Sequence, residues 1–499
     1  MPAFRPPTPP AGAAPGPGTP LDATTRPVPA GSRLRLLPTT ERPSPGALTG
    51  GSPWRMLRLT PRGDRLVDAW DAGVPVGNRA GARRLAGRLV DGGLATLLPE
   101  PTPPRDAADL VDVVVPVRDD PEGLEATLAA LGADVRVVVV DDGSAERLVA
   151  AGPVAGPVEV VRHARPGGPA AARNTGWRRA DREIVAFVDA GCCPPPGWLA
   201  ALVGHFSDPA VAAVAPRIVT PVAARRTVRG AYEHARGALD LGAVGGPVRP
   251  RSPIPYVPTA ALLVRRSALE AVGGLDETLR TGEDVDLVWR LEAAGWRVRY
   301  DPSVRVGHPV RPSWRTWLAQ RFAYGRSAAA LSARHPGQLA PAVVTPPAAI
   351  AGAAVAAGHP WLGLAVAGAA AARDLRGRDG PLPPSTVARL AAAWHLAAGR
   401  GLARALRREW GPALLAAALV SRRARRLAVA AALPVLAEWW RERPGVDLPR
   451  WVGVALADDL AYGAGVWAGA VRARSGACLL PAWRGRARRR TRPHNPRAD

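Results

Sequence analysis

Lysine is missing from this sequence. All 66 Lys and Arg residues are arginines, against 42 acidic residues, which gives a formal net charge of +24. Such an excess can indicate nucleic-acid binding, because guanidinium groups form charge-assisted, often bidentate bonds with phosphate oxygens. Here the arginines are spread along the whole chain without the interleaved aromatic residues of a single-strand binding surface. We therefore expect no nucleic-acid partner. A coding bias toward Arg and Ala explains the excess positive charge, which should attract the protein to anionic lipid.

Cysteine is scarce. Cys192 and Cys193 are adjacent and Cys478 is distant, a spacing that gives neither a disulfide framework nor a zinc site. A reducing compartment is therefore expected. The N-terminus also lacks an apolar core between a basic start and a cleavage site, so no secretory signal is expected there.

Large apolar side chains are few in residues 1–50, which are rich in Pro, Gly, Ala and Thr. This composition cannot offset its own ordering entropy and predicts a disordered tail. Residues 51–104 predict a small α+β module. WRMLRLTPRGDRLVDAW suits a strand, a turn and a helix, and ARRLAGRLVDGGLATLL suits a second helix that ends at Gly92 and Gly93 before a final strand.

Residues 108–312 alternate between expected strands and helices. VDVVVPV (111–117), VRVVVVDDGS (135–144) and EIVAFVDAG (183–191) are continuous apolar runs that suit buried parallel strands, and EGLEATLAALG (122–132) suits an amphipathic helix. The alternation predicts a Rossmann-like α/β domain on a parallel sheet, with ligands beyond the carboxyl ends of its strands. Acidic residues fall at those ends.

Charge of either sign is missing from residues 335–372, a stretch longer than the roughly 20 residues that span a bilayer. We expect one or two membrane-inserted helices or a membrane-seated hairpin there, with buried helices of a soluble protein as the alternative. ALLAAALV (413–420) and RLAVAAALPVLAEWW (426–440) suit an interfacial helix or a marginal second span. Residues 313–480 are thus predicted to form a helical region at the cell membrane, followed by a basic tail, 481–499, that lies on cytoplasmic lipid.

Acidic residues occur in four places where sugar-nucleotide chemistry requires them. The loop from Pro116 to Asp120 combines backbone groups with a carboxylate that can hold a nucleoside. Asp141 and Asp142 end a buried strand, where a carboxylate can accept the N–H of a uracil-type base, and Gly143 lets the chain turn closely around it. Ordinary turns often have the same composition, so neither motif is specific alone.

The third place is Asp189, directly after the strand IVAFV. The fourth is Gly282-Glu283-Asp284, which opens the helix VDLVWRLEAAG. Helix capping is an alternative explanation for Glu283 and Asp284, because a carboxylate at a helix N-terminus is favoured electrostatically whatever its function.

The order of these motifs resembles the large inverting family-2 glycosyltransferases, whose fold is called GT-A. The resemblance covers about residues 110–310 and is carried by VDVVVPVRDD, VVVVDDGS, GGPAAARNTGW, IVAFVDAGCCPPPGWL, GGLDETLRTGEDVDLVWRL and VRVGH. It implies a catalytic domain that passes a sugar from a nucleotide donor to an acceptor hydroxyl. The donor-binding residues that it implies are Pro116, Val117, Asp120, Asp141, Asp142, Arg173 and Asp189.

The resemblance also implies the remaining parts of the site. Asp284, with Glu283 beside it, matches the general base of the family's xED motif. Asp189 matches the first aspartate of the DxD motif, and with His308 it matches the ligands of Mg²⁺ or Mn²⁺. Such an ion would neutralise the diphosphate leaving group.

Two departures from the family pattern bear on these expectations. Gly191 replaces the second aspartate of DxD, which puts the metal site in doubt. The QxxRW motif of processive members is also absent, with Gln320-Arg321-Phe322 in roughly its place, so processivity is not supported by that motif.

At finer grain the whole chain resembles family members that glucosylate a redox-cofactor precursor made from a ribosomal peptide. The likeness rests on the 51–104 module, the VPVRD loop and the segment WRTWLAQRFAYGRSAAAL. It implies UDP-glucose as donor and a small peptide-derived acceptor, which the module would grip, although a purely structural role for the module fits equally. The alternatives are a membrane-associated transferase of rhamnose or galactose to a cell-wall or lipid-linked glycan, and a non-enzymatic Arg-rich binder of nucleic acid or membranes.

Overall fold

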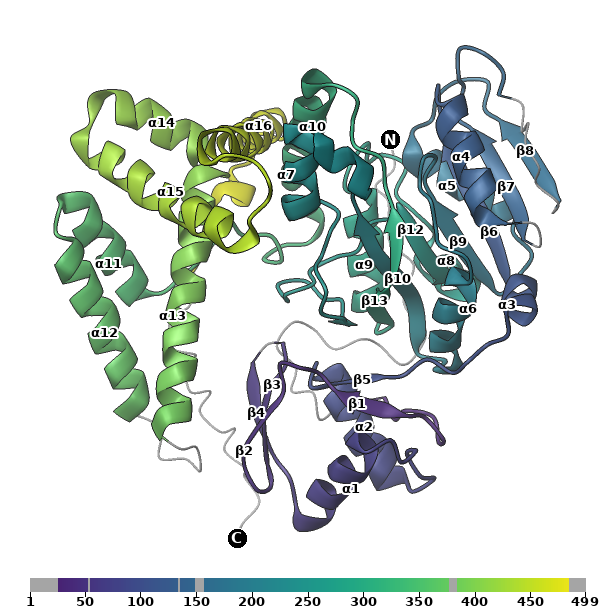
Figure 1. Cartoon of the computed structure of the whole chain (residues 1–499), viewed down its shortest axis with the longest axis horizontal. Coiled ribbons are helices and arrows are strands. Elements are labelled where there is room, and N and C mark those ends of the chain that lie inside the picture. Colours follow the sequence, from purple (N-terminus) through teal and green to yellow (C-terminus); the bar gives the residue numbers. More distant parts are fainter. Residues whose placement is uncertain (1–25, 53, 133–134, 149–156, 377–383, 484–499) are drawn as a thin grey trace, which may run out of the picture. The chain divides into compact units, whose positions relative to one another are not determined.

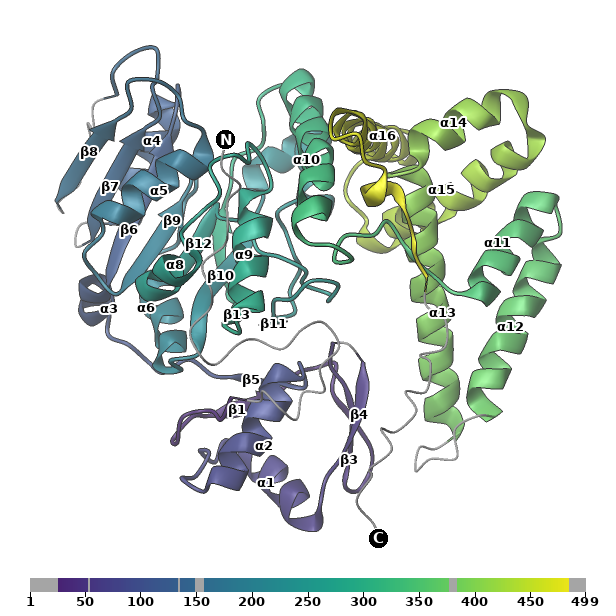
Figure 2. The same ribbon diagram turned by 180° about the vertical axis from the view of Figure 1, so that it is seen from behind.

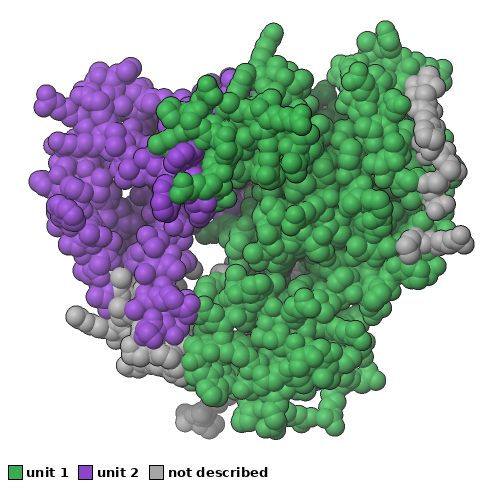
Figure 3. Space-filling model, in the orientation of Figure 1, with its two compact units in different colours: residues 1–317, 442–451 green, residues 318–441, 452–499 purple. Residues whose placement is uncertain are grey.

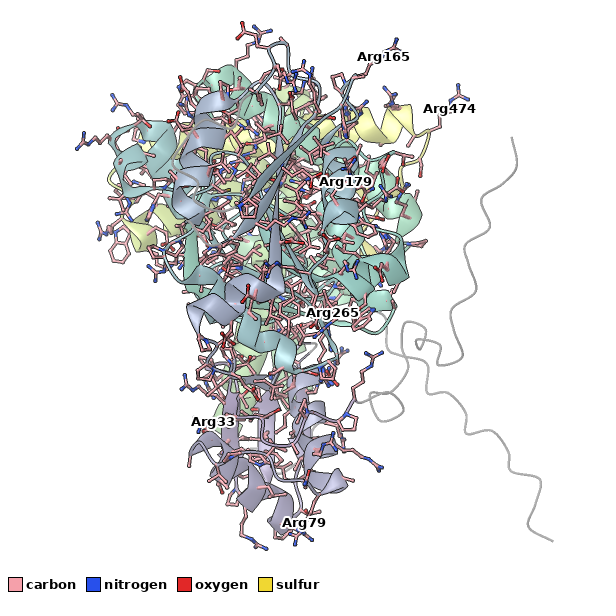
Figure 4. All side chains as sticks on the ribbon, turned by 90° about the vertical axis from the view of Figure 1, so that its right-hand side faces the viewer. Arg33, Arg79, Arg165, Arg179, Arg265 and Arg474 are labelled. Atoms are coloured by element: carbon pink, nitrogen blue, oxygen red, sulfur yellow. The ribbon has the colours of Figure 1, made fainter. Side chains whose placement is uncertain are left out.

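The computed structural model (Figures 1 and 2) describes residues 26–52, 54–132, 135–148, 157–376 and 384–483. The chain divides into two compact units, residues 1–317 with 442–451 and residues 318–441 with 452–499 (Figure 3). The labelled arginines Arg79, Arg165 and Arg474 project outward from different parts of the chain (Figure 4), so the positive charge is carried by both units.

The first unit is built on an eight-stranded sheet in the order β11-β13-β10-β12-β9-β6-β7-β8. The strands are β6 (Val111–Val117), β7 (Arg136–Asp141), β8 (Val158–Arg162), β9 (Ile184–Val188), β10 (Val211–Val219), β11 (Gly246–Pro247), β12 (Ala261–Arg265) and β13 (Arg297–Gly307). Strands β6 to β9 pair in parallel, as the sequence predicted. β12 pairs antiparallel with both β9 and β10, so the prediction of an all-parallel sheet is wrong on this side. An apolar run indicates burial but carries no information on strand direction.

Helices cover both faces of this sheet. They are α3 (Pro104–Leu110), α4 (Pro121–Leu131), α5 (Pro169–Arg179), α6 (Trp198–Val203), α7 (Val228–Arg236), α8 (Arg266–Val272) and α9 (Glu283–Ala293). Successive side chains of a strand point to opposite faces. Val113 and Val115 of β6 accordingly share a core with Leu124 of α4, whereas Val114 lies against Gly176 of α5. Burial on both faces explains why five of the seven residues of the strand are valine.

The N-terminal module belongs to the first unit and has its own core. β2 (Glu41–Ser44), β3 (Ala47–Gly50) and β4 (Arg55–Arg58) form an antiparallel sheet, β1 (Leu34–Leu36) pairs with β5 (Ala95–Leu97), and the helices are α1 (Pro61–Asp71) and α2 (Ala80–Asp91). The strand, two helices and final strand predicted after residue 51 are present. Residues 34–50 form strands with Leu34 and Leu48 buried, so the disordered tail predicted for residues 1–50 is wrong there. Residues 1–25 of that tail lie outside the described residues.

The strands in residues 34–50 were not predicted from the sequence, because β1 is stabilised by pairing with the distant β5. Ion pairs also connect the module with the eight-stranded sheet. Asp91, the last residue of α2, accepts hydrogen bonds from Arg297 of β13 at 2.8 and 3.0 Å, and Arg297 also donates to Asp208 at 2.9 Å. All three side chains are buried.

The second unit is helical. Its elements are α10 (Trp314–Arg334, which starts in the first unit), α11 (Pro346–Ala357), α12 (Pro360–Arg376), α13 (Pro384–Arg407), α14 (Gly411–Val420), α15 (Arg422–Glu442), most of α16 (Leu448–Arg472), and the short strand pair β14 (Val343–Val344) and β15 (Ala482–Trp483). Within the described ranges, no helix combines the length and apolar character needed to cross a membrane. The charge-free stretch 335–372 falls largely in α11 and α12, helices of 12 and 17 residues, and the membrane-inserted helices predicted there find no support. Of the basic tail, residues 484–499 lie outside the described part.

Buried ion pairs join the helices of this unit. Arg321 of α10 lies 3.1 Å from Asp458 of α16, and Arg407 of α13 donates to Asp459 at 2.9 Å. Arg321 is the arginine that stands near the place of the absent QxxRW motif. Its fully buried pairing with α16 gives it a structural role.

Candidate active site

The predicted site residues follow the carboxyl ends of parallel strands that pair with one another. Asp120 comes after β6, Asp142 after β7, and Asp189 after β9. Since the carboxyl ends of parallel strands meet at one edge, the sheet itself brings these three segments together.

Asp142 organises the loop that precedes α5. Its Oδ1 accepts from the Gly167 N–H at 2.7 Å and contacts His163 Nδ1 at 2.8 Å, and its Oδ2 accepts from the Gly168 N–H at 2.8 Å. His163 in turn contacts the Thr175 hydroxyl through Nε2 at 2.9 Å. Both carboxylate oxygens of Asp142 are thus engaged within the protein, and they fix the N-terminus of the helix that carries Arg173.

Asp141 is fully buried and also engaged. It accepts from the Ser144 N–H at 2.8 Å and from Arg162 at 2.9 Å. Burial alone would raise the pKa of Asp141, but the hydrogen bonds from Ser144 and the charge of Arg162 outweigh it and lower the pKa. Asp141 therefore stays ionised and braces the turn at Gly143, where φ is +69°.

The loop after β6 is held in the same manner. Asp120 caps α4, accepting from the Gly123 N–H at 2.9 Å, a structural role that the sequence analysis did not consider for this residue. Asp119 accepts from the Ala145 N–H at 2.8 Å. Pro116 is half-buried, and Val117 is buried with its carbonyl bound to the Asp142 N–H. The carboxylates of Asp119 and Asp120 thus hold the loop itself.

Arg173 of α5 joins two of the predicted site acids, Glu283 and Asp189. Its Nη1 donates to Glu283 Oε1 at 2.9 Å and its Nη2 donates to Asp189 Oδ1 at 2.5 Å. The guanidinium is 4% exposed, and burial alone would lower its pKa, but the charges of Asp189 and Glu283 raise it. Arg173 therefore remains a cation between two carboxylates that come from different parts of the chain.

Asp284 follows Glu283 in the first turn of α9, after Gly282, whose φ is +85°. Burial and the neighbouring charge of Glu283 raise the pKa of Asp284 to about 7, while the backbone hydrogen bond from Val285 and the charge of Arg173 act the other way. A carboxyl with a pKa near neutrality suits proton abstraction at physiological pH. Asp286, on the same helix, forms an i, i+4 ion pair with Arg290 at 2.7 Å.

His308 follows β13 and lies within electrostatic reach of Asp189. Burial lowers the pKa of His308, and the charge of Asp189 opposes this in part, so the ring is neutral near pH 7. Its Nδ1 lies 2.8 Å from the Pro309 carbonyl oxygen, which can only accept, so Nδ1 carries the proton and Nε2 keeps a free lone pair.

Gly191 lies against the residue that follows His308. Its φ is +88°, and a Cβ at this position would approach Pro309 Cγ to 2.8 Å. The glycine that replaces the second DxD aspartate is therefore required by the backbone. Among the described residues, no group of three or more His, Cys, Asp or Glu side chains could hold a metal ion. Asp189 and His308 provide two ligands of types that divalent cations accept, so an ion would need the donor's phosphate oxygens to complete its shell.

Arg280 is a residue of this region that the sequence analysis missed. Its Nη1 donates to the Gly167 carbonyl at 3.2 Å and lies close over Gly168, so it connects the Asp142 loop with the start of α9. Arg280 lies two residues before Gly282, inside GGLDETLRTGEDVDLVWRL, and this position could have indicated that it belongs to the site.

Comparison with known proteins identifies the family of this chain. The model of "Glycosyl transferase family 2" matches residues 112–273. The chain is 40% identical over 452 residues to the pre-mycofactocin glycosyltransferase of Mycobacterium tuberculosis, covering 87% of this chain and 94% of that protein. An uncharacterised glycosyltransferase of the same organism is 33% identical over 193 residues, 38% of this chain and 83% of that one. The chain therefore belongs to glycosyl transferase family 2, with a GT-A-like α/β fold, and is a homologue of the pre-mycofactocin glycosyltransferase.

Solved structures resemble the chain more distantly. The mannosyltransferase PcManGT of Pyrobaculum calidifontis, in complex with GDP-Man and Mn²⁺, is 21% identical, covers 74% of this chain and 88% of that one, and has a TM-score of 0.41. TarS of S. aureus in complex with UDP is 18% identical, covers 44% and 65%, and has a TM-score of 0.31.

Proposed function

We propose that the protein is an inverting glycosyltransferase that moves glucose from UDP-glucose to a hydroxyl of the peptide-derived redox-cofactor precursor pre-mycofactocin. The observation that carries the acceptor is the 40% identity to the pre-mycofactocin glycosyltransferase, which covers 87% of this chain and 94% of that protein. The donor sugar and the stereochemistry rest on the family resemblance together with the chemistry of the site.

Asp284 is the proposed general base. As the acceptor oxygen attacks the anomeric carbon, its proton passes to the Asp284 carboxylate, a new C–O bond forms, and the bond between the anomeric carbon and UDP breaks on the opposite face. Attack opposite to the leaving group inverts the configuration. The pKa of about 7 supports this role, because the carboxylate is then available at neutral pH yet basic enough to accept a proton.

Arg173 and Glu283 are proposed as positioning residues. Glu283 is held by Arg173, and its charge is one cause of the raised pKa of Asp284. Arg173 also fixes one oxygen of Asp189, and on this proposal the other oxygen serves the donor. A preorganised set of charges of this kind stabilises a transition state without reorganisation at the moment of reaction.

A divalent cation, Mg²⁺ or Mn²⁺, fits the residues present only in a shared manner. Asp189 Oδ2 and His308 Nε2 would hold it together with diphosphate oxygens of the donor. When bound, the ion would supply charge neutralisation of the UDP leaving group. On this proposal the protein alone binds the ion weakly, and chelation suppresses transfer.

Donor hydrolysis and transfer by the purified protein test the proposal. Incubation with UDP-glucose, dTDP-rhamnose and UDP-galactose, with and without synthetic pre-mycofactocin, should give UDP release from UDP-glucose and a glucosylated acceptor by mass spectrometry. Turnover of dTDP-rhamnose or UDP-galactose alone would instead favour a transferase that decorates a cell-wall or lipid-linked glycan.

A further inference from the structure

Two helices of the helical unit carry no polar side chain, yet most of their residues are exposed or only partly covered. α11 has the sequence PPAAIAGAAVAA, and Ala354 is its buried residue; α14 has the sequence GPALLAAALV, and Gly411 is its buried residue. A helix that is apolar all round is normally enclosed by a protein core or by lipid. The described residues of the unit enclose neither helix.

The ends of these helices meet at one edge of the unit. Arg426, near the start of α15, donates to the carbonyl of Ala357, the last residue of α11, at 3.4 Å. The α11–α12 turn therefore lies beside the α14–α15 turn, as both views of the ribbon show (Figures 1 and 2). We call this the hairpin edge. Its exposed large apolar side chains are Trp361, Leu362, Leu364, Leu415, Leu419 and Val420.

These side chains are unusually exposed. Trp361 is 80%, Leu419 83% and Val420 88% accessible, the three highest values among the exposed large hydrophobic residues of the described chain. Single exposed apolar residues need no explanation, whereas a group of them at one place marks an interaction surface.

Positive charge without negative charge surrounds the hairpin edge. Arg422 and Arg423 are exposed two and three residues after Val420, and Arg425 and Arg426 are exposed in the next turn. No acidic residue occurs between Glu409 and Glu438, and none occurs in residues 335–372. Apolar side chains flanked by arginine suit the boundary of an anionic membrane, where the former enter the acyl region and the latter contact lipid phosphates.

We propose that the hairpin edge docks the protein on a membrane surface rich in anionic lipid. The Trp361 and Leu419–Val420 side chains enter the headgroup–acyl boundary, and Arg422 and Arg423 bind lipid phosphates. The anchor is interfacial and lies in a unit separate from the glycosyltransfer residues, so it does not depend on the identity of the sugar or the acceptor.

Flotation of the full-length protein with vesicles tests this docking. The wild type should float with phosphatidylglycerol–phosphatidylcholine vesicles and much less with phosphatidylcholine alone. The triple variant Trp361→Ser, Leu419→Ser, Val420→Ser should lose binding at least about tenfold. The matched control is Val222→Ser with Val471→Ser, two residues 70% and 75% exposed outside the hairpin edge, which should bind as the wild type does. Thermal melting of each variant verifies that it is folded.

A second pair of variants separates charge from apolar insertion. Arg422→Gln with Arg423→Gln should reduce the preference for phosphatidylglycerol, whereas Arg62→Gln with Arg65→Gln, two exposed arginines of α1, should not. Equal flotation of the wild type and the triple variant would overturn the proposal, as would the absence of flotation with either vesicle. If light scattering shows that the triple change converts a dimer into a monomer while vesicle binding is unaltered, the edge is a contact between two copies, and the proposal also fails.

Discussion

Arg173 and Glu283 lie 110 residues apart and are joined by a buried hydrogen bond of 2.9 Å between Nη1 and Oε1. The same guanidinium holds Asp189. One cation thus connects the acid that follows β9 with the pair of acids that opens α9. Burial is the main cause of the raised pKa of Asp284; the charge of Glu283 raises the pKa further, and the charge of Arg173 lowers it.

Removing the cation should make Asp284 still more basic. In Arg173→Gln the charge that lowers the pKa of Asp284 is lost, so the acidic limb of the kcat/KM profile should move to higher pH, with a fall in kcat of about 10²-fold near neutrality. Arg173→Lys keeps the charge but cannot bridge both acids, so its limb should stay closer to that of the wild type. If the acidic limb of the folded Arg173→Gln variant stays at the wild-type pH, Arg173 does not influence the pKa of Asp284. Circular dichroism verifies folding, since loss of one partner in a buried ion pair is destabilising.

Neutralising Glu283 should have the opposite effect. The charge of Glu283 raises the pKa of Asp284, so Glu283→Gln should shift the acidic limb of kcat/KM to lower pH, by about one unit, while the amide oxygen can still accept from Arg173. Opposite shifts in the Arg173 and Glu283 variants would be hard to obtain from a general loss of structure. A shift of the acidic limb in the same direction in both variants would contradict the assignment of Asp284 as the titrating base.

The raised pKa of Asp284 should also cost stability. The folded pKa is about 7, against an ordinary value of 3.8, so the folded protein binds the extra proton and its relative stability falls as pH rises through this interval. Asp284→Asn removes the buried charge and should stabilise the protein by about 1–2 kcal/mol at pH 8, with little effect at pH 4. Thermal or urea unfolding at both pH values measures this. A stabilisation that does not grow with pH would mean that the carboxyl is not perturbed.

Restoring the second aspartate of DxD should not restore a metal site. In Gly191→Asp the side chain would have to accommodate φ +88° and a contact with Pro309, so we expect lower stability and no tighter binding of Mn²⁺. Gly197→Asp is the matched control, because Gly197 has φ +75° but open space around its Cβ position. Calorimetric titration with Mn²⁺ and UDP compares the two; tighter Mn²⁺ binding by the first variant would show that the loop adapts.

The sequence predicted the parts of the fold that local pattern determines. The valine runs of β6 and β7 and the glycines that end α2 are found where expected. Strand direction and long-range pairing were not predictable: β12 runs against its neighbours, and β1 needs β5, some 60 residues later, to form at all. These contacts leave no periodic trace in the residues themselves.

The candidate site divides in the same way. Asp142, Asp189 and Asp284 were singled out correctly as strand-end and helix-start acids, but their partners could not be read from the sequence. Asp142 is saturated by the Gly167–Gly168 backbone, and Arg173 binds carboxylates in the absence of donor. Both features depend on contacts between segments far apart in the chain, which short motifs do not encode.

Turnover of Asp284→Asn with saturating UDP-glucose and acceptor tests the account most directly, with UDP affinity measured on the same preparation. If Asp284 is the general base, transfer falls by at least about 10³-fold, because the amide cannot take the acceptor proton. The affinity for UDP stays within about twofold of the wild type. Transfer at the wild-type rate by this variant would contradict that role of Asp284.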